Sequence, residues 1–168
     1  MMKNLMVLLG AAILCGCATQ QPLFITKIDP YTKVQQYRLS GIYPANCPGD
    51  SAFYYSVEIG FLGTGDTNAL NIEYIGPSWK FLDAKQGLDL LVDGVPMKLK
   101  GIPGASTDVG SYGVTENVYF QVNREVVKVL ASAEKIQLRV SGSKGLIEKC
   151  LNKTEISGIA QIIPYVKD

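Results

Sequence analysis

The feature that most constrains the fold of this chain is an alternation of apolar and polar residues with a period of two. Over residues 53–61 the apolar positions are Phe53, Tyr55, Val57, Ile59 and Phe61. The same pattern returns at 70–74, and apolar segments flank Asp93-Gly94. Such alternation is typical of a strand with one buried face. Since Asp-Gly favours a two-residue turn, the segments on either side of it are predicted to pair as a hairpin, with Pro96 on an edge strand.

Later segments complete the predicted elements. Further strands are expected at 78–83, 116–122, 135–142 and 146–151. Asn123 is a good N-cap for a helical stripe that ends at Ala133. Asn152 with Glu155 resembles a capping box and predicts a second short helix, although a terminal strand stays open there. The sequence therefore predicts a mainly β protein, an antiparallel β-sandwich or curved sheet with one or two short helices in the C-terminal third. An α+β fold is the alternative.

The start of the chain has the features of an export signal. Lys3 precedes an uncharged apolar stretch, Leu5 to Leu14, which is too short to span a bilayer as a helix. The stretch ends in Leu14-Cys15-Gly16-Cys17, which resembles the lipobox of bacterial lipoproteins. The resemblance implies removal of 1–16 as a signal peptide and attachment of lipid to Cys17, which anchors the protein to a membrane. An ordinary signal peptide that leaves Cys17 as a free thiol is the alternative.

The same resemblance gives an address and a domain plan. In such lipoproteins an Asp after the lipidated Cys favours the inner membrane, and Ala18 stands there, so the outer membrane is implied, with the domain in the periplasm. We expect a lipidated tether over 17–30 and a single β-rich domain over 31–168. In a second interpretation, residues 23–25 pair as a first edge strand and shorten the tether.

Charge bears on the possible partners. The full chain has 16 basic and 15 acidic residues, and the one charge within 1–16 is Lys3, so the chain after that segment has 15 of each. A neutral chain has no overall field that attracts nucleic acid. We therefore expect no nucleic-acid partner.

Two cysteines, Cys47 and Cys150, remain outside the N-terminal segment. An even number of cysteines in an oxidising compartment predicts a disulfide. The bridge would close a loop of about 100 residues and stabilise the fold by roughly 4–5 kcal/mol in the chain-entropy description. A redox-active or nucleophilic thiol is the alternative.

Residues that carry catalytic chemistry are sparse. The chain has no histidine, which removes histidine-based triads and histidine-ligated metal sites. We predict no metal site and no cofactor. A hydrolase built on two carboxylates needs no histidine, and its candidates are Asp83, Asp89, Asp93, Asp108 and Glu116. No spacing among these five marks a pair.

Tyrosines and one glycine-rich segment are the candidate contact elements. Aromatic side chains offer large contact areas, and the candidates are Tyr54, Tyr74, Tyr112 and Tyr119. Residues 101–113 hold four glycines and a proline and predict a long flexible loop. The function expected from these features is non-catalytic binding or scaffolding of a protein partner in the cell envelope. A module that binds a carbohydrate or peptidoglycan fragment is the first alternative, and the carboxylate hydrolase is the second.

Overall fold

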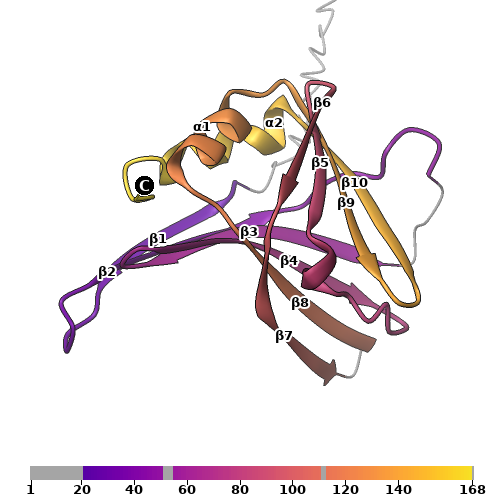
Figure 1. Ribbon diagram of the computed structural model, residues 1–168, viewed down its shortest axis with the longest axis horizontal. Coiled ribbons are helices and arrows are strands. Elements are labelled where there is room, and N and C mark those ends of the chain that lie inside the picture. The colour runs from indigo at the N-terminus through magenta and orange to yellow at the C-terminus, as the bar shows by residue number, and fades with distance from the viewer. Residues whose placement is uncertain (1–20, 51–54, 111–112, 168) are drawn as a thin grey trace, which may run out of the picture.

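The computed structural model describes residues 21–50, 55–110 and 113–167 and arranges them in two antiparallel sheets (Figure 1). The six-stranded sheet has the order β1 (Leu23–Ile28), β2 (Gln35–Ile42), β3 (Ser56–Thr64), β4 (Thr67–Gly76), β8 (Gly113–Gln121), β7 (Gly101–Gly110). The four-stranded sheet has the order β10 (Gly145–Asn152), β9 (Lys135–Gly142), β5 (Leu88–Val92), β6 (Val95–Leu99). The helices are α1 (Arg124–Ser132), α2 (Lys153–Ile156) and two 3₁₀ turns, η1 (Ala84–Gln86) and η2 (Ser157–Ile162). The prediction of a mainly β, antiparallel fold with short helices is confirmed.

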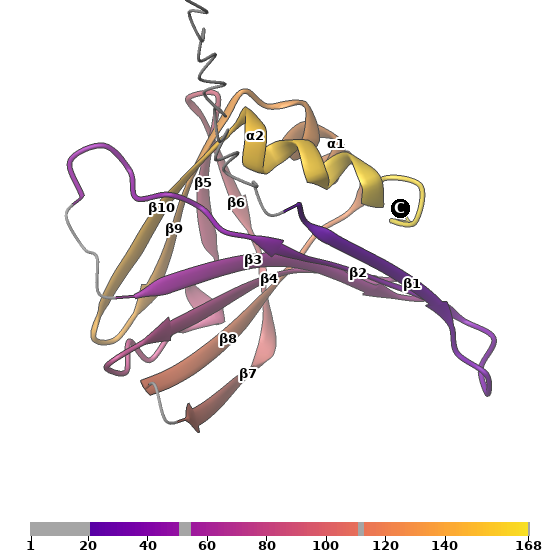
Figure 2. The same cartoon turned by 180° about the vertical axis from the view of Figure 1, so that it is seen from behind.

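The two sheets face each other at a steep angle and enclose the core between them (Figure 2). The chain passes from the four-stranded to the six-stranded sheet at Lys100, the single residue between β6 and β7. Gly101 is needed at this crossing, because a Cβ there would lie 1.7 Å from the carbonyl oxygen of Ala84. One continuous segment thus joins the edges of both sheets.

The core contains the residues that alternation predicts. Val57, Ile59 and Phe61 of β3 are buried, as are Leu70 and Ile72 of β4. From the other sheet, apolar residues of β5, β9 and β10 pack against them: Leu88, Leu90, Ile136, Leu138, Val140, Ile147 and Leu151. Fully burying one such side chain contributes about 1.5–3 kcal/mol, so the two apolar faces are the main source of stability.

The helices lie at one end of the space between the sheets, where α1 contacts η2. Asn123 Oδ1 accepts a hydrogen bond from the Val126 N–H at 2.9 Å, which confirms the predicted N-cap. The capping box of Asn152 and Glu155 is also present and starts α2. The buried faces of these helices, with Val127, Leu130 and Ile156, close the core.

The predicted hairpin around Asp93-Gly94 is confirmed. Asp93 has φ 49° and Gly94 has φ 83°, the left-handed conformations of a type I′ turn. Pro96 lies on β6, an edge strand, as expected. The turn is held to the start of β9, the neighbour of β5 in the sheet, because the Asp93 carboxylate accepts hydrogen bonds from the N–H groups of Glu134 and Lys135.

Two predicted elements are wrong. Residues 101–110 form β7, paired with β8, where a flexible loop over 101–113 was expected. An edge strand that is exposed on both faces needs no alternation of apolar and polar residues, so alternation cannot predict a strand there. The segment 78–83 forms no strand, apart from an isolated pairing of Leu82 with Gly142. Phe81 adopts φ 51° there, which is incompatible with an extended strand.

The N-terminal part of the described chain is also a strand. β1 covers 23–28 and pairs with β2 over six consecutive residue pairs. This agrees with the interpretation in which residues 23–25 form an edge strand. Cys17 and the segment 1–16 lie outside the described residues.

Candidate functional site

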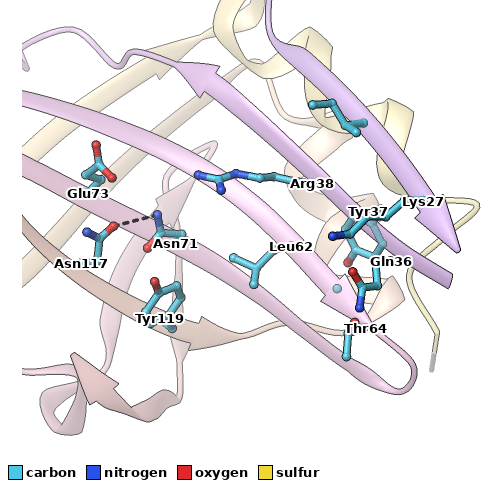
Figure 3. A pocket seen from close by; sticks show the side chains of 12 residues that line it. Lys27, Gln36, Tyr37, Arg38, Leu62, Thr64, Asn71, Glu73, Asn117 and Tyr119 are labelled. Atoms are coloured by element: carbon cyan, nitrogen blue, oxygen red, sulfur yellow. Dashed lines mark hydrogen bonds between the residues drawn. The ribbon is translucent and has the colours of Figure 1, made fainter. Parts of the chain in front are cut away.

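The outer face of the six-stranded sheet carries a hollow of about 630 Å³, which we call the sheet hollow (Figure 3). Strands β1, β2, β3, β4 and β8 all contribute to it. Its lining residues are Ile25, Lys27, Gln36, Tyr37, Arg38, Leu62, Gly63, Thr64, Asn71, Glu73, Asn117 and Tyr119. The volume is within the usual range of about 300–1,000 Å³ for small-ligand sites.

Strand register brings the polar side chains of the sheet hollow together. Asn71 of β4 lies opposite Tyr119 of β8, and Glu73 lies opposite Asn117. The Asn71 Nδ2 group donates a hydrogen bond to Asn117 Oδ1 at 3.2 Å. The opposite neighbour of Asn71 on β3 is Gly60, which contributes no side chain.

Asn71 is the unusual residue of this group. It is only 8% exposed, and its Oδ1 atom has no hydrogen-bond partner among the described residues. A buried polar atom left without a partner costs about 1–3 kcal/mol, so such atoms are rare in native proteins. This oxygen is therefore an acceptor that the fold itself does not satisfy.

The predicted tyrosines have different positions. Tyr119 is half-buried and lines the sheet hollow. Tyr74 is wrong as a contact residue, since it is 1% exposed and its hydroxyl donates to the Ser78 carbonyl at 2.8 Å. Burial raises the pKa of the Tyr74 phenol. Tyr74 is buried because its side chain lies on the same, inner face of β4 as Leu70 and Ile72. Tyr54 and Tyr112 lie outside the described residues.

Glu116 has a structural position. Its carboxylate lies on the inner face of β8, is 2% exposed, and accepts three backbone N–H groups of the segment that follows β4. The donors are Lys80 at 2.5 Å, Phe81 at 3.2 Å and Leu82 at 2.7 Å. These bonds hold the segment in its non-extended conformation, with Phe81 at positive φ.

The other four candidate carboxylates also have partners in the fold. Asp83 accepts from the Lys85 N–H and caps η1, and Asp89 pairs with Lys98 at 3.1 Å. Asp108 accepts from the Val109 N–H, and Asp93 bonds the start of β9 as described above. These contacts account for all five carboxylates in structural terms.

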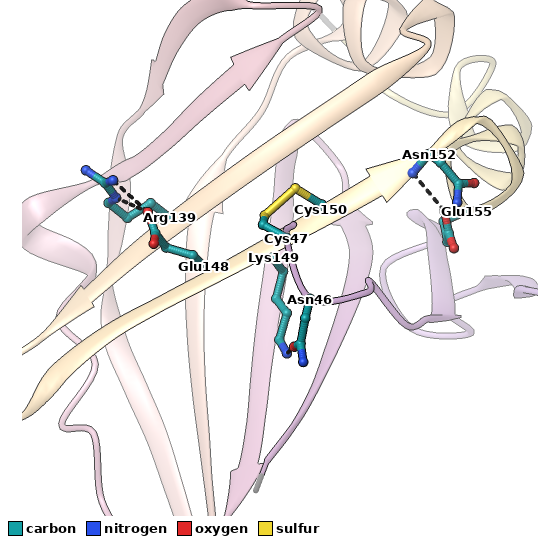
Figure 4. Close-up of a disulfide and its surroundings, with 8 residues drawn as sticks. All are labelled: Asn46, Cys47, Arg139, Glu148, Lys149, Cys150, Asn152 and Glu155. Atoms are coloured by element: carbon teal, nitrogen blue, oxygen red, sulfur yellow. Dashed lines mark hydrogen bonds and ion pairs between the residues drawn. A yellow bond between two sulfur atoms is a disulfide. The ribbon is translucent and has the colours of Figure 1, made fainter. Parts of the chain in front are cut away.

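The predicted disulfide between Cys47 and Cys150 is confirmed (Figure 4). Their Cα atoms are 4.9 Å apart, and the bridge joins residues separated by 103 positions. Beside it, Ala45 and Cys150 exchange two backbone hydrogen bonds of 3.0 and 2.9 Å. The segment before Cys47 therefore covers part of the outer edge of β10.

Lys149 is a buried charged residue that the sequence pattern did not reveal. It shares the inner face of β10 with Ile147 and Leu151, at every second position, and is 3% exposed. Its Nζ lies 4.4 Å from the ring centroid of Tyr55 and donates a hydrogen bond to Asn46 Oδ1 (Figure 4). Burial lowers the pKa of Lys149, and the charge of Asp50 opposes this effect.

The outer face of the four-stranded sheet has a row of alternating charges, which we call the charge row. The register places Lys98, Asp89, Arg139 and Glu148 side by side across β6, β5, β9 and β10. Lys98 pairs with Asp89 at 3.1 Å, and Arg139 pairs with Glu148 at 2.6 Å (Figure 4). These residues also line a hollow of about 700 Å³, in which the four charges are paired with one another.

The two edges of the six-stranded sheet differ. At one edge, β1 pairs in unbroken register and exposes Leu23, Ile25 and Ile28. At the other edge, β7 contains Pro103 and a register shift between Ile102 and Ser106. Proline, bulges and charged side chains, lysine above all, are the usual features that prevent an edge from pairing with another chain, and β1 carries one of these, Lys27. β7 has a proline and a register shift, whereas β1 has no proline and no register shift within its described residues.

Comparison with known proteins adds no family: no protein-family model matches the chain, and no curated protein is significantly similar to it. Among the described residues, no helix has the length and apolar character needed to cross a membrane. Within the same parts of the chain, no three Cys, Asp or Glu side chains gather as a metal site would require.

Proposed function

We propose that this protein is an outer-membrane lipoprotein, anchored by lipid on Cys17, whose periplasmic domain binds a protein partner of the cell envelope without catalysing a reaction. The lipobox-like sequence at 14–17 supports the anchor and the removal of 1–16. The structural use of the five candidate carboxylates supports a binding role over a hydrolytic one.

The observation that carries the protein-binding role is edge strand β1. A regular edge strand offers a row of backbone donors and acceptors to an incoming strand, and exposed apolar side chains add contact area. β1 offers both, and the hairpin from β1 to β2 extends beyond the rest of the molecule in both views (Figures 1 and 2). The expected partner therefore contributes an extended segment that adds to this sheet.

The position of β1 in the chain fits this role. Six residue steps separate Cys17 from Leu23. A fully extended chain of that length reaches about 20 Å. A lipid on Cys17 would hold the start of β1, Leu23, within that distance of the membrane surface, so the expected partner is a membrane protein or another anchored protein.

Crosslinking in intact cells, followed by purification of this protein and mass spectrometry, tests the proposal. The wild-type protein should capture a defined partner, and a Leu23→Lys/Ile28→Lys variant should lose it, because two charges oppose an apolar strand. A matched control is Val95→Lys/Val109→Lys, which adds the same charges at exposed positions on β6 and β7.

Three results would contradict parts of the proposal. Equal capture by the β1 variant and the wild type would show that this edge is not the docking element. Loss of capture in the β6/β7 control alone would move the interface elsewhere. A Cys17→Ser variant that still fractionates with the outer membrane would remove the anchor.

A further inference from the structure

We propose that the sheet hollow is a second binding site, for a neutral, hydroxyl-rich saccharide, with Asn71 and Tyr119 at its centre. This inference does not depend on the protein-binding role, because the β1 residues that carry that role in its test, Leu23 and Ile28, do not line the hollow.

The unsatisfied oxygen of Asn71 favours a ligand that donates hydrogen bonds. The Nδ2 group of Asn71 is bonded to Asn117, while Oδ1 has no partner among the described residues. Figure 3 shows Asn71, Asn117 and Tyr119 grouped on neighbouring strands at the hollow. An apolar ligand would leave Oδ1 unpaired. Because Oδ1 is buried, a ligand hydroxyl can donate to it only if the Asn71 carboxamide rotates, which exchanges the present bond of Nδ2 to Asn117 for bonds to the ligand.

The charges of the hollow favour a neutral ligand. Glu73 lies on β4, and Arg38 and Lys27 lie on β2 and β1. An anionic ligand that spans the hollow would face Glu73, and a cationic one would face both basic groups. A neutral ligand with hydroxyl groups can instead donate to the carboxylate and accept from the guanidinium.

The aromatic and aliphatic lining narrows the class to a saccharide. Tyr119 presents a half-buried ring, and Leu62 and Ile25 add apolar area on β3 and β1. A sugar ring has an apolar C–H face and a rim of hydroxyl groups, so it matches a ring beside carboxamides. The hollow is also large enough for more than a single small polar group.

The side chains of this site are held by the sheet. Asn71, Glu73, Asn117 and Tyr119 all lie on β4 and β8, in unbroken register from Ala69 to Gly76. Opposite Asn71, a Cβ on Gly60 would lie 3.0 Å from the Leu39 carbonyl oxygen, a tight contact that disfavours a side chain there. The site is therefore built on strands, which position groups more firmly than loops do.

Calorimetric titration of the full-length protein tests the inference, in a detergent whose headgroup is not a sugar. The first probe is the soluble tetramer of N-acetylglucosamine, and the second is purified insoluble peptidoglycan in a pulldown. The wild type should bind at least one of them. Asn71→Leu and Tyr119→Ala should each weaken binding at least tenfold. Gln137→Leu, an amide on the outer face of the other sheet, should leave binding unchanged.

Each outcome has a defined meaning. Binding of the tetramer supports a free oligosaccharide as the ligand, and binding of peptidoglycan alone supports a cell-wall polymer. No binding of either probe by the folded wild type would overturn the inference, as would equal binding by the wild type and Asn71→Leu. Thermal unfolding of each variant separates lost binding from lost folding, and Asn71→Leu should unfold at or above the wild-type temperature.

Discussion

The outer faces of the two sheets differ in how fully their polar side chains are paired. On the four-stranded sheet, the charge row pairs Lys98 with Asp89 and Arg139 with Glu148. On the six-stranded sheet, Asn71 keeps an oxygen that no described group satisfies. Both faces are hollowed to a similar volume. The volume of the hollows therefore does not distinguish the two faces as binding sites. The unsatisfied hydrogen-bond acceptor does, and it favours the face of the six-stranded sheet.

The contrast depends on the six-stranded sheet being otherwise well satisfied, and Glu116 is its most important buried acceptor. Glu116→Ala would leave three backbone N–H groups without their acceptor, and we expect the free energy of unfolding to fall by about 3–5 kcal/mol. Urea denaturation measures this. Glu116→Gln, which keeps one acceptor oxygen, should lose less. Glu125→Ala, at an exposed ion pair on α1, is the control and should change little.

The four-stranded sheet depends on its covalent tie in the same way. Replacing Cys47 and Cys150 together by Ala should lower the free energy of unfolding by roughly 2–4 kcal/mol, because the unfolded chain regains the freedom of a long loop. The value lies below the roughly 4–5 kcal/mol of the chain-entropy description, because the unfolded chain retains some structure. Reductant should reproduce the loss in the wild type and have no further effect on the double variant. A wild-type unfolding temperature that is unchanged by reductant contradicts this prediction.

Lys149 on the inner side of the four-stranded sheet is a buried charge, and the pH dependence of the stability should reveal it. Burial lowers the pKa of Lys149 in the folded protein below its ordinary value of 10.5. At a pH between the lowered pKa of Lys149 in the folded protein and its ordinary value in the unfolded chain, the unfolded chain binds more protons than the folded protein. The free energy of unfolding should therefore rise with pH in this range. Asp50 faces this lysine and opposes the shift, while Lys80 shares the Tyr55 ring with it.

Urea denaturation from pH 7 to 9 measures the rise, because above this range the tyrosines of the unfolded chain, with an ordinary pKa of about 10, begin to lose their protons. Lys149→Met should flatten the curve. The matched exposed variant Lys153→Met should retain the wild-type slope. If Lys149→Met and the wild type have parallel curves, the buried charge is not the source.

The smallest effect is expected from the charge row itself. A double-mutant cycle of Arg139→Ala and Glu148→Ala should give a coupling energy of about 0.2–1 kcal/mol, because both side chains are about half exposed. Added salt should reduce it further. A coupling well above this range would mean that the charge row is a stabilising network, and the contrast between the two faces would be weaker.

Alternation and turn chemistry predicted the parts of the fold whose strands have one buried face. The strands around Phe61, Leu70 and Leu138, the turn at Asp93 and the cap at Asn123 are examples. These are local signals, in which a side chain's parity or a turn residue's conformation determines the outcome. Strand β2 was not predicted, because its alternation breaks at the register shift between Leu39 and Ile42.

The candidate site was less accessible to sequence reasoning. Tyr119 was predicted as a contact residue, but Asn71 was not, because an asparagine on a strand's outer face looks like an ordinary solvent-facing residue. Whether Asn71 can belong to a binding site depends on which residues of β8 lie beside it, and the register between β4 and β8 determines those residues. Glu116 shows the same limit, since its role depends on backbone N–H groups about 35 residues away.

The disulfide also determines how the molecule carries mechanical load. Strands β3 to β9 and β10 up to Cys150 lie inside the loop between Cys47 and Cys150, whereas β1 and β2 lie before it. A pull on the N-terminal end of β1, resisted near the C-terminus, passes through β1 and β2, crosses the S–S bond, and continues into α2 and η2. Backbone tension therefore bypasses most of both sheets. The first two strands should yield first under force, while the body behind Cys47 keeps its shape.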